Sequence, residues 1–222
     1  MSRRAAADRE RELPIEVSVP TKELRGHLTI GARRGRGRGH HRRRTWRQHA
    51  VALPEFIRLG APLGTILGLK GNLATAYQKL GRLEPALQMK RDVYSGTLKL
   101  FGEESSDTIR EASNIGGLLN SLQRCEEVKT LMRKTMPVAQ RVLGESNSLT
   151  LRMKMHYARA LYRDSAATLD DLREAVKTLE ETERTARRVL GNAHPLVDVL
   201  EWDLRKSRAA LDARETPPPG GA

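Results

Sequence analysis

The chain has 222 residues, of which 38% are hydrophobic and only 4% are aromatic. This composition excludes a large core built on Phe and Trp, and it favours helices packed through Ala and Leu. The formal net charge is +13, but residues 1–50 carry 14 Lys/Arg against 5 Asp/Glu, a net of +9, whereas the remaining 26 Lys/Arg and 22 Asp/Glu give only +4. The basicity therefore belongs mostly to the N-terminal segment.

The single cysteine, Cys125, excludes an intramolecular disulfide and a cysteine-based metal cluster, and it fits a reducing compartment. No apolar run approaches the roughly 18 residues of a membrane-spanning helix. The first residues lack the apolar stretch of a secretory signal, and Asp8, Glu10 and Glu12 argue against a mitochondrial presequence. We therefore expect a cytoplasmic protein, with a nuclear location as the alternative, and no membrane partner.

Residues 1–59 are predicted to be a disordered basic tail. Within it, residues 33–47 hold eight Arg and three Gly, a density of like charge that prevents a core from forming. Three interpretations stay open. The arginines and Trp46 could bind nucleic acid through phosphates and base stacking, the run could be a solvated tail without a ligand, or Arg42–Arg44 could be a nuclear-import patch. The absence of Arg-Gly-Gly repeats favours the second. Residues 213–222, rich in Pro and Gly, form a second predicted disordered tail.

A repeat begins at Gly60. Gly60, Gly102 and Gly144 are 42 residues apart, and Gly191 follows 47 residues later. The last three each follow a helical pattern with a basic residue in its final turn, and glycine just past a helix end is the usual stop because it accepts a left-handed conformation. The predicted organisation is three repeat units and a last helix, at 60–101, 102–143, 144–190 and 191–212.

Inside each unit, apolar residues recur at the helical spacing of three and four. The pattern Asn72-Leu73-Ala74 of the first unit returns as Asn114-Ile115-Gly116 and as His156-Tyr157-Ala158. A single hairpin cannot bury its apolar stripe, whereas stacked hairpins can. Five extra residues fall around Ser165 to Leu169, between the two helices of the third unit. Each unit should therefore hold two helices, with breaks near Gly81, Arg124 and Asp164.

These residues resemble the tetratricopeptide repeat. Leu73-Ala74, Tyr77 and Ala86 match its signature of Leu-Ala-x-x-Tyr followed by Ala, and the 42-residue unit with Gly191-x-x-His194-Pro195 is similar to the kinesin-light-chain variety. Residues 1–59 carry no heptad repeat, unlike the segment before the repeats of kinesin light chains. The resemblance implies an all-α fold over 60–212, a right-handed superhelical solenoid of stacked helical hairpins that binds partner proteins.

The resemblance also implies that the first helix of each hairpin lines a concave face. At the eighteen positions assigned to this face over three units, no residue is acidic and five are basic. We therefore predict a groove for a protein or peptide, with an acidic peptide as the specific hypothesis. Arg offers bidentate donors to carboxylates, and Asn can pair with a peptide backbone. The predicted contacts are Asn72, Lys79, Arg110, Asn114, Arg152, His156, Arg159 and Arg163.

No catalytic constellation is apparent, because the sequence has no Gly-x-Ser-x-Gly, phosphate loop, His-Glu-x-x-His or dinucleotide fingerprint. Cys125 is followed by Glu126 and Glu127, which should raise the pKa of its thiol. We predict a non-catalytic scaffold or adaptor without a cofactor or metal. The alternatives are a nucleic-acid-binding protein acting through residues 33–47 and a repeat fragment of a larger signalling protein.

Overall fold

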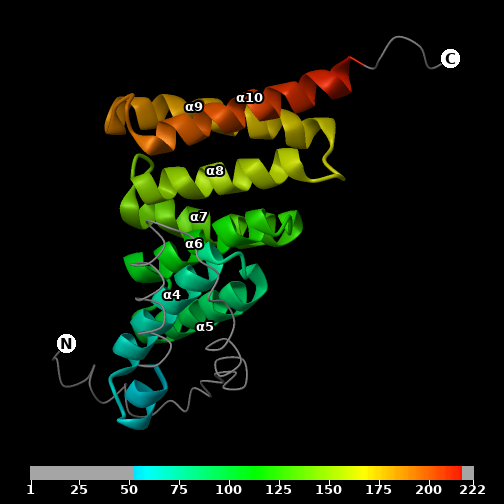
Figure 1. Cartoon of the computed structure of the whole chain (residues 1–222). Helices are drawn as coiled ribbons and strands as arrows, with labels where there is room; N and C mark the ends of the chain where they lie inside the picture. Colours follow the sequence, from blue (N-terminus) through cyan, green and yellow to red (C-terminus); the bar gives the residue numbers. More distant parts are fainter. Residues whose placement is uncertain (1–52, 217–222) are drawn as a thin grey trace, which may run out of the picture. The chain divides into compact units, whose positions relative to one another are not determined.

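The computed structural model describes residues 53–216, and this part of the chain is helical without strands (Figure 1). It divides into two units, the first reaching Leu100 and the second starting at Phe101. The predicted all-α fold is therefore confirmed for the described residues. The Arg/Gly-rich run at 33–47 lies outside them, so nucleic-acid binding there stays a prediction. After a short helix at 53–58, the helices are α4 Leu63–Lys79, α5 Leu83–Phe101, α6 Ser106–Ser121, α7 Cys125–Leu143, α8 Ser148–Arg163, α9 Leu169–Leu190 and α10 Pro195–Glu215.

The first unit is built on the hairpin of α4 and α5. Leu73, Ala74 and Ala86 are completely buried, as the repeat pattern predicts. Gly96 lets the helices approach closely, since a Cβ added there would lie 2.6 Å from Cδ2 of Leu67. Residue size, and not only polarity, therefore sets the distance between the two helices.

The short helix at 53–58 corrects one expectation, because the sequence placed this stretch in the disordered tail. Leu53 at its start is only 1% exposed, whereas Pro54, Glu55, Phe56 and Arg58 are exposed, so the segment is helical but only its first residue is buried. Pro54 suggested a break. In the first turn of a helix, however, the missing N–H of proline removes no hydrogen bond, so proline is compatible with that position.

The second unit contains two hairpins, α6–α7 and α8–α9, followed by α10. Helix α8 is at its centre, since it contacts α6, α7, α9 and α10 (Figure 1). The first helices α6, α8 and α10 thus follow one another as neighbours, and α9 packs against both α8 and α10. The core of this unit consists mainly of aliphatic side chains and includes the fully buried Leu118, Met132, Leu151, Leu161, Leu179 and Leu200.

The repeat glycines end the second helix of each hairpin, as predicted. Gly102, Gly144 and Gly191 have φ of 81°, 89° and 83°. At Gly144 and Gly191, ψ is 159° and 158°, which lies beyond the left-handed helical region. Only glycine adopts that combination without a large steric cost. The conformation is therefore more restrictive than the one that the sequence suggested.

The turns inside the first two hairpins use the same Schellman motif. The N–H groups of Gly81 and Arg82 donate to the carbonyls of Gln78 and Tyr77, at 3.0 and 2.9 Å. The corresponding bonds in the next hairpin start at Gln123 and Arg124, 42 residues later, and reach Asn120 and Leu119 at 3.2 and 3.0 Å. Gln123 has a φ of 58° and is the one non-glycine residue with positive φ between residues 53 and 216. The second unit therefore places a glutamine where the first has a glycine.

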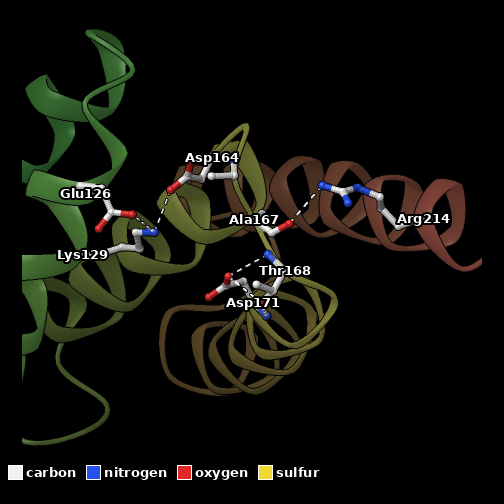
Figure 2. A network of polar contacts seen from close by, with 8 residues as sticks. Glu126, Lys129, Asp164, Ala167, Thr168, Asp171 and Arg214 are labelled. Atoms are coloured by element: carbon white, nitrogen blue, oxygen red, sulfur yellow. Dashed lines mark hydrogen bonds and ion pairs between the residues drawn. The ribbon is translucent and has the colours of Figure 1, made fainter.

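In the third repeat, the five extra residues change the turn between α8 and α9 (Figure 2). Asp164 ends α8 with an extended backbone and a ψ of 126°. Its Oδ2 accepts a hydrogen bond of 2.7 Å from Nζ of Lys129 on α7, and both side chains are nearly buried. Lys129, followed by the backbone N–H of Ala166, holds the pKa of the Asp164 carboxyl below its ordinary value. An ion pair to the neighbouring hairpin thus fixes the start of the insert.

The end of the insert is fixed by a capping box and by α10 (Figure 2). Asp171 Oδ2 accepts from the N–H of Thr168 at 2.8 Å, and the Thr168 Oγ1 accepts from the N–H of Asp171 at 3.1 Å. A guanidinium N–H of Arg214 donates to the carbonyl of Ala167 at 3.0 Å. This contact lies in the last turn of α10, which continues to Glu215, beyond the predicted end at 212.

Candidate functional site

The candidate site is the row of side chains that α6, α8 and α10 present at the repeat positions assigned to ligand contact. We call this row the first-helix face. The structure exposes three of the predicted contacts on it, Arg110, Arg152 and Arg163, and leaves Asn114 half-buried. Two further predicted contacts, Asn72 and Lys79, are exposed on α4 in the first unit. The remaining two are less accessible, since His156 is buried and Arg159 is partly buried.

The three exposed arginines are available to a ligand. Arg110 makes an ion pair of 2.7 Å with Asp107 one turn earlier, and both side chains are about half exposed, at 55% and 46%. Such surface pairs contribute at most about 1 kcal/mol, so a ligand can displace them. Arg152 and Arg163 make no ion pair or hydrogen bond within the described residues. The face therefore carries unneutralised positive charge along α8.

His156 is a correction to the predicted contacts, because it is packed between α6 and α8. It is 7% exposed, and its ring lies against Gly117, where an added Cβ would be 3.2 Å from Cε1. Asn120 of α6 donates to the His156 carbonyl at 3.0 Å, while Nδ1 of the imidazole has no partner among residues 53–216. Burial, then the nearby Arg159 and Arg152, lower the pKa of His156 to about 3. It is therefore a neutral packing residue at pH 7.

Arg159 is a second correction, because an acid of this chain already holds it. Its Nε donates to Oδ1 and Oδ2 of Asp203 on α10, at 2.9 and 3.1 Å, and a terminal guanidinium N–H donates to the same carboxylate. The hydroxyl of Tyr162 donates to Oδ1 of Asp203 at 2.7 Å. The Asp203 side chain is fully buried, and that of Arg159 is 18% exposed. Burial raises the pKa of Tyr162, and hydrogen bonding to Asp203 adds to this rise.

Asp203 is the site residue that the sequence analysis missed, although a signal was available. It follows His156 by 47 residues, the same offset that separates Gly191 from Gly144. It therefore occupies the repeat position of Asn72, Asn114 and His156. Extending the repeat register into the last helix would have found an acid there, opposite the arginines of α8.

Helix α10 adds apolar surface to the first-helix face. Val199 and Trp202 are 39% and 44% exposed, which is high for side chains of this size and polarity. The ammonium of Lys206 lies 5.7 Å from the centroid of the Trp202 ring, within cation–π range. The face therefore passes from basic and polar groups on α6 and α8 to an aromatic, cationic surface on α10.

The chemistry around Cys125 gives no activated nucleophile. This residue lies at the start of α7, beside a cavity of about 340 Å³ between the α6–α7 and α8–α9 turns. Burial raises the pKa of its thiol, Asp164 raises it further, and Lys129 acts in the opposite direction. The predicted rise in the pKa of this thiol is confirmed, although burial is the larger cause.

Within residues 53–216, no group of three or more His, Cys, Asp or Glu side chains is placed to hold a metal ion, and no helix is long and apolar enough to cross a membrane.

Comparisons with known proteins agree with this fold. Residues 67–107 match the family model of the tetratricopeptide repeat. Two crystal structures of nearly identical tetratricopeptide-like repeats of a putative kinesin light chain from Podospora anserina are similar to the chain. One, a substituted variant, has a TM-score of 0.61 at 18% identity and covers 79% of this chain and 85% of its own. The other has a TM-score of 0.57 at 19% identity, with 79% and 86% covered.

A third similar structure is BtubC (BKLC) from P. vanneervenii, with a TM-score of 0.58 at 16% identity, covering 82% of this chain and 78% of that one. No curated protein matches the sequence. At these identities the structural likeness shows the fold. The resemblance inferred from the sequence is thereby confirmed, since one segment matches the family model of the tetratricopeptide repeat and the fold is similar to that of the repeats of a putative kinesin light chain.

Proposed function

We propose that this chain is a non-catalytic scaffold that binds a protein or peptide ligand carrying carboxylates on its first-helix face. Repeats of the tetratricopeptide type generally mediate protein–protein interaction, which supports the broader part of the proposal. The charge of the face carries the specific part. Its exposed ionic groups are all basic, and its one acid, Asp203, is fully buried and held by Arg159.

The exposed groups have the donor chemistry that such a ligand requires. Arg152 and Arg163 present free guanidinium groups, and each can form two parallel hydrogen bonds to a carboxylate. Arg110 can exchange Asp107 for a ligand acid, since their pair is solvent-exposed. Asn114 offers an amide that can pair with a peptide backbone. Within the first unit, Asn72 and Lys79 present the same two kinds of donor on α4.

The same argument removes two of the predicted contacts from the ligand site. His156 is buried, and the guanidinium of Arg159 donates its Nε–H and one terminal N–H to Asp203. We therefore assign ligand contact to the α6–α8 part of the face, with Arg110, Arg152 and Arg163 as the charged contacts. A reducing, cytoplasmic setting fits the one free and buried cysteine.

The test is a double charge reversal, Arg110→Glu with Arg152→Glu, in the full chain. Binding to fluorescent peptides rich in Asp and Glu is measured by anisotropy, with a neutral peptide of equal length for comparison. Losing two charge-assisted contacts should weaken binding by about a hundredfold. The matched control is Lys134→Glu with Lys177→Glu, which makes the same change in net charge at exposed positions of α7 and α9. Unchanged affinity in the first variant, or an equal loss in the control, would refute the proposal.

A further inference from the structure

A basic hollow lies between α9 and α10. It has a volume of about 620 Å³, and its lining includes four arginines and one amide, Arg184, Arg187, Arg188, Arg208 and Asn192. The first three share one side of α9, because positions three and four apart in a helix are neighbours. Arg208 reaches the hollow from α10. None of these residues belongs to the first-helix face.

The acids in the lining leave part of this charge unneutralised. Glu180 pairs with Arg208 at 2.6 Å, and Glu183 pairs with Arg187. A third acid, Glu201 of α10, also pairs with Arg187, so the two lining carboxylates and Glu201 are all engaged by an arginine. Arg184 and Arg188 are exposed and make no ion pair or hydrogen bond within the described part of the chain.

The lining of the hollow is polar and accessible to solvent. Arg184, Arg188 and Arg208 are exposed, and only one lining residue, Leu204, is aliphatic. Such a lining suits an anion better than an apolar helix.

We propose that this hollow binds a compact, multiply charged oxyanion of the phosphate class. A phosphate group carries up to two negative charges at neutral pH and three acceptor oxygens, so it can engage Arg184 and Arg188 together. A single carboxylate supplies one charge and two oxygens. The chemistry is shared by two sources, a free polyphosphate and a phosphoserine side chain of a partner protein, and the experiment separates them.

The experiment titrates the full chain by calorimetry with inorganic pyrophosphate, with a neutral peptide bearing one phosphoserine, and with the unphosphorylated peptide. The test variant is Arg184→Gln with Arg188→Gln, which keeps the helical side chains long and removes two charges. Binding should weaken by about tenfold or more in this variant. It should change less than about twofold in Lys134→Gln with Lys177→Gln, which loses the same charge elsewhere.

Each outcome decides the proposal. Weakening for pyrophosphate assigns the hollow to free polyphosphate, and weakening for the phosphopeptide alone assigns it to a phosphorylated partner. The proposal is overturned if neither probe binds, if the unphosphorylated peptide binds equally well, or if the control variant weakens binding as much as the test variant. Arg110→Glu with Arg152→Glu should leave pyrophosphate binding intact, so a failure of the carboxylate-binding proposal is distinguishable from a failure here.

Discussion

Helices α6 and α8 occupy the same place in consecutive repeats, but they present their equivalent residues differently. At the repeat position of Asn72, α6 has Asn114, half-buried on the face, and α8 has His156, buried against α6. The equivalent Arg110 and Arg152 are both exposed, whereas the position that holds Gly117 in α6 holds Arg159 in α8, which is bound by Asp203 of α10. The repeat position therefore fixes the place of a residue on its helix, whereas the residues of the neighbouring helix determine whether its side chain is accessible to a ligand.

The largest effect is expected from removing Asp203, the acid of α10 that binds Arg159 of α8. We expect Asp203→Ala to lower the free energy of unfolding by about 3 kcal/mol, because it leaves the guanidinium of Arg159 and the hydroxyl of Tyr162 without their partner in a largely buried site. Urea denaturation measures the loss. As a control, Asp198→Ala at an exposed position of the same helix should change stability by less than about 0.5 kcal/mol. Equal effects of the two substitutions would mean that the Arg159–Asp203 pair is not a structural link.

A smaller effect should distinguish His156 from the equivalent Asn114. The pKa of His156 is about 3 in the folded protein against 6.5 for the free side chain. Since the folded pKa is depressed, the unfolded chain binds the proton first as pH falls. The neutral imidazole therefore supports stability fully above about pH 6.5, and this support is lost progressively below it, by about 2 kcal/mol between pH 7 and pH 5.

His156→Asn, which restores the residue found at positions 72 and 114, should remove this part of the acid sensitivity. The measurement compares the free energies of unfolding of both proteins at several pH values between about 7 and 5. Carboxylates that titrate in this range contribute to both curves and cancel in the difference. Parallel curves would show that the pKa of His156 is the same in the folded and unfolded protein, contrary to the packing seen between α6 and α8.

The smallest effect concerns how the two helices end. Helix α6 closes through Gln123 at a φ of 58°, whereas α8 closes through the extended Asp164. We expect Gln123→Gly to raise the free energy of unfolding by about 0.5 kcal/mol, since glycine avoids the Cβ clash of this conformation but has a more flexible unfolded state. The reverse change in the first hairpin, Gly81→Gln, should destabilise by about 1 kcal/mol. If Gln123→Gly is neutral or destabilising, the Gln123 side chain stabilises the turn in another way.

The repeat register predicted much of this fold. The spacing of Gly102, Gly144 and Gly191 located three helix ends, and the breaks at Gly81, Arg124 and Asp164 lie where the hairpins turn. These features are local, because each depends on the conformation of one residue or on the periodicity of one helix. The insert near Ser165 was also located, but its contacts with Lys129 and Arg214 join residues 35 and 47 positions apart, and no local pattern contains them.

The candidate site was predicted less completely, for the same reason. Arg110, Arg152 and Arg163 are exposed as expected, while His156 is buried and Arg159 is neutralised by an acid 44 residues away. The basic hollow of Arg184 and Arg188 had no sequence signal beyond the charge of one helix, since it requires α10 to lie beside α9.

The sequence by itself determined the helical hairpins, their 42-residue register and the glycines that end them, because helix periodicity and backbone conformation are properties of short segments. Only the tertiary structure decided which polar side chains face solvent. Burial, ion pairing and the pKa of a group such as His156 depend on which residues of a neighbouring helix lie within a few ångströms, and that information is distributed over two repeats.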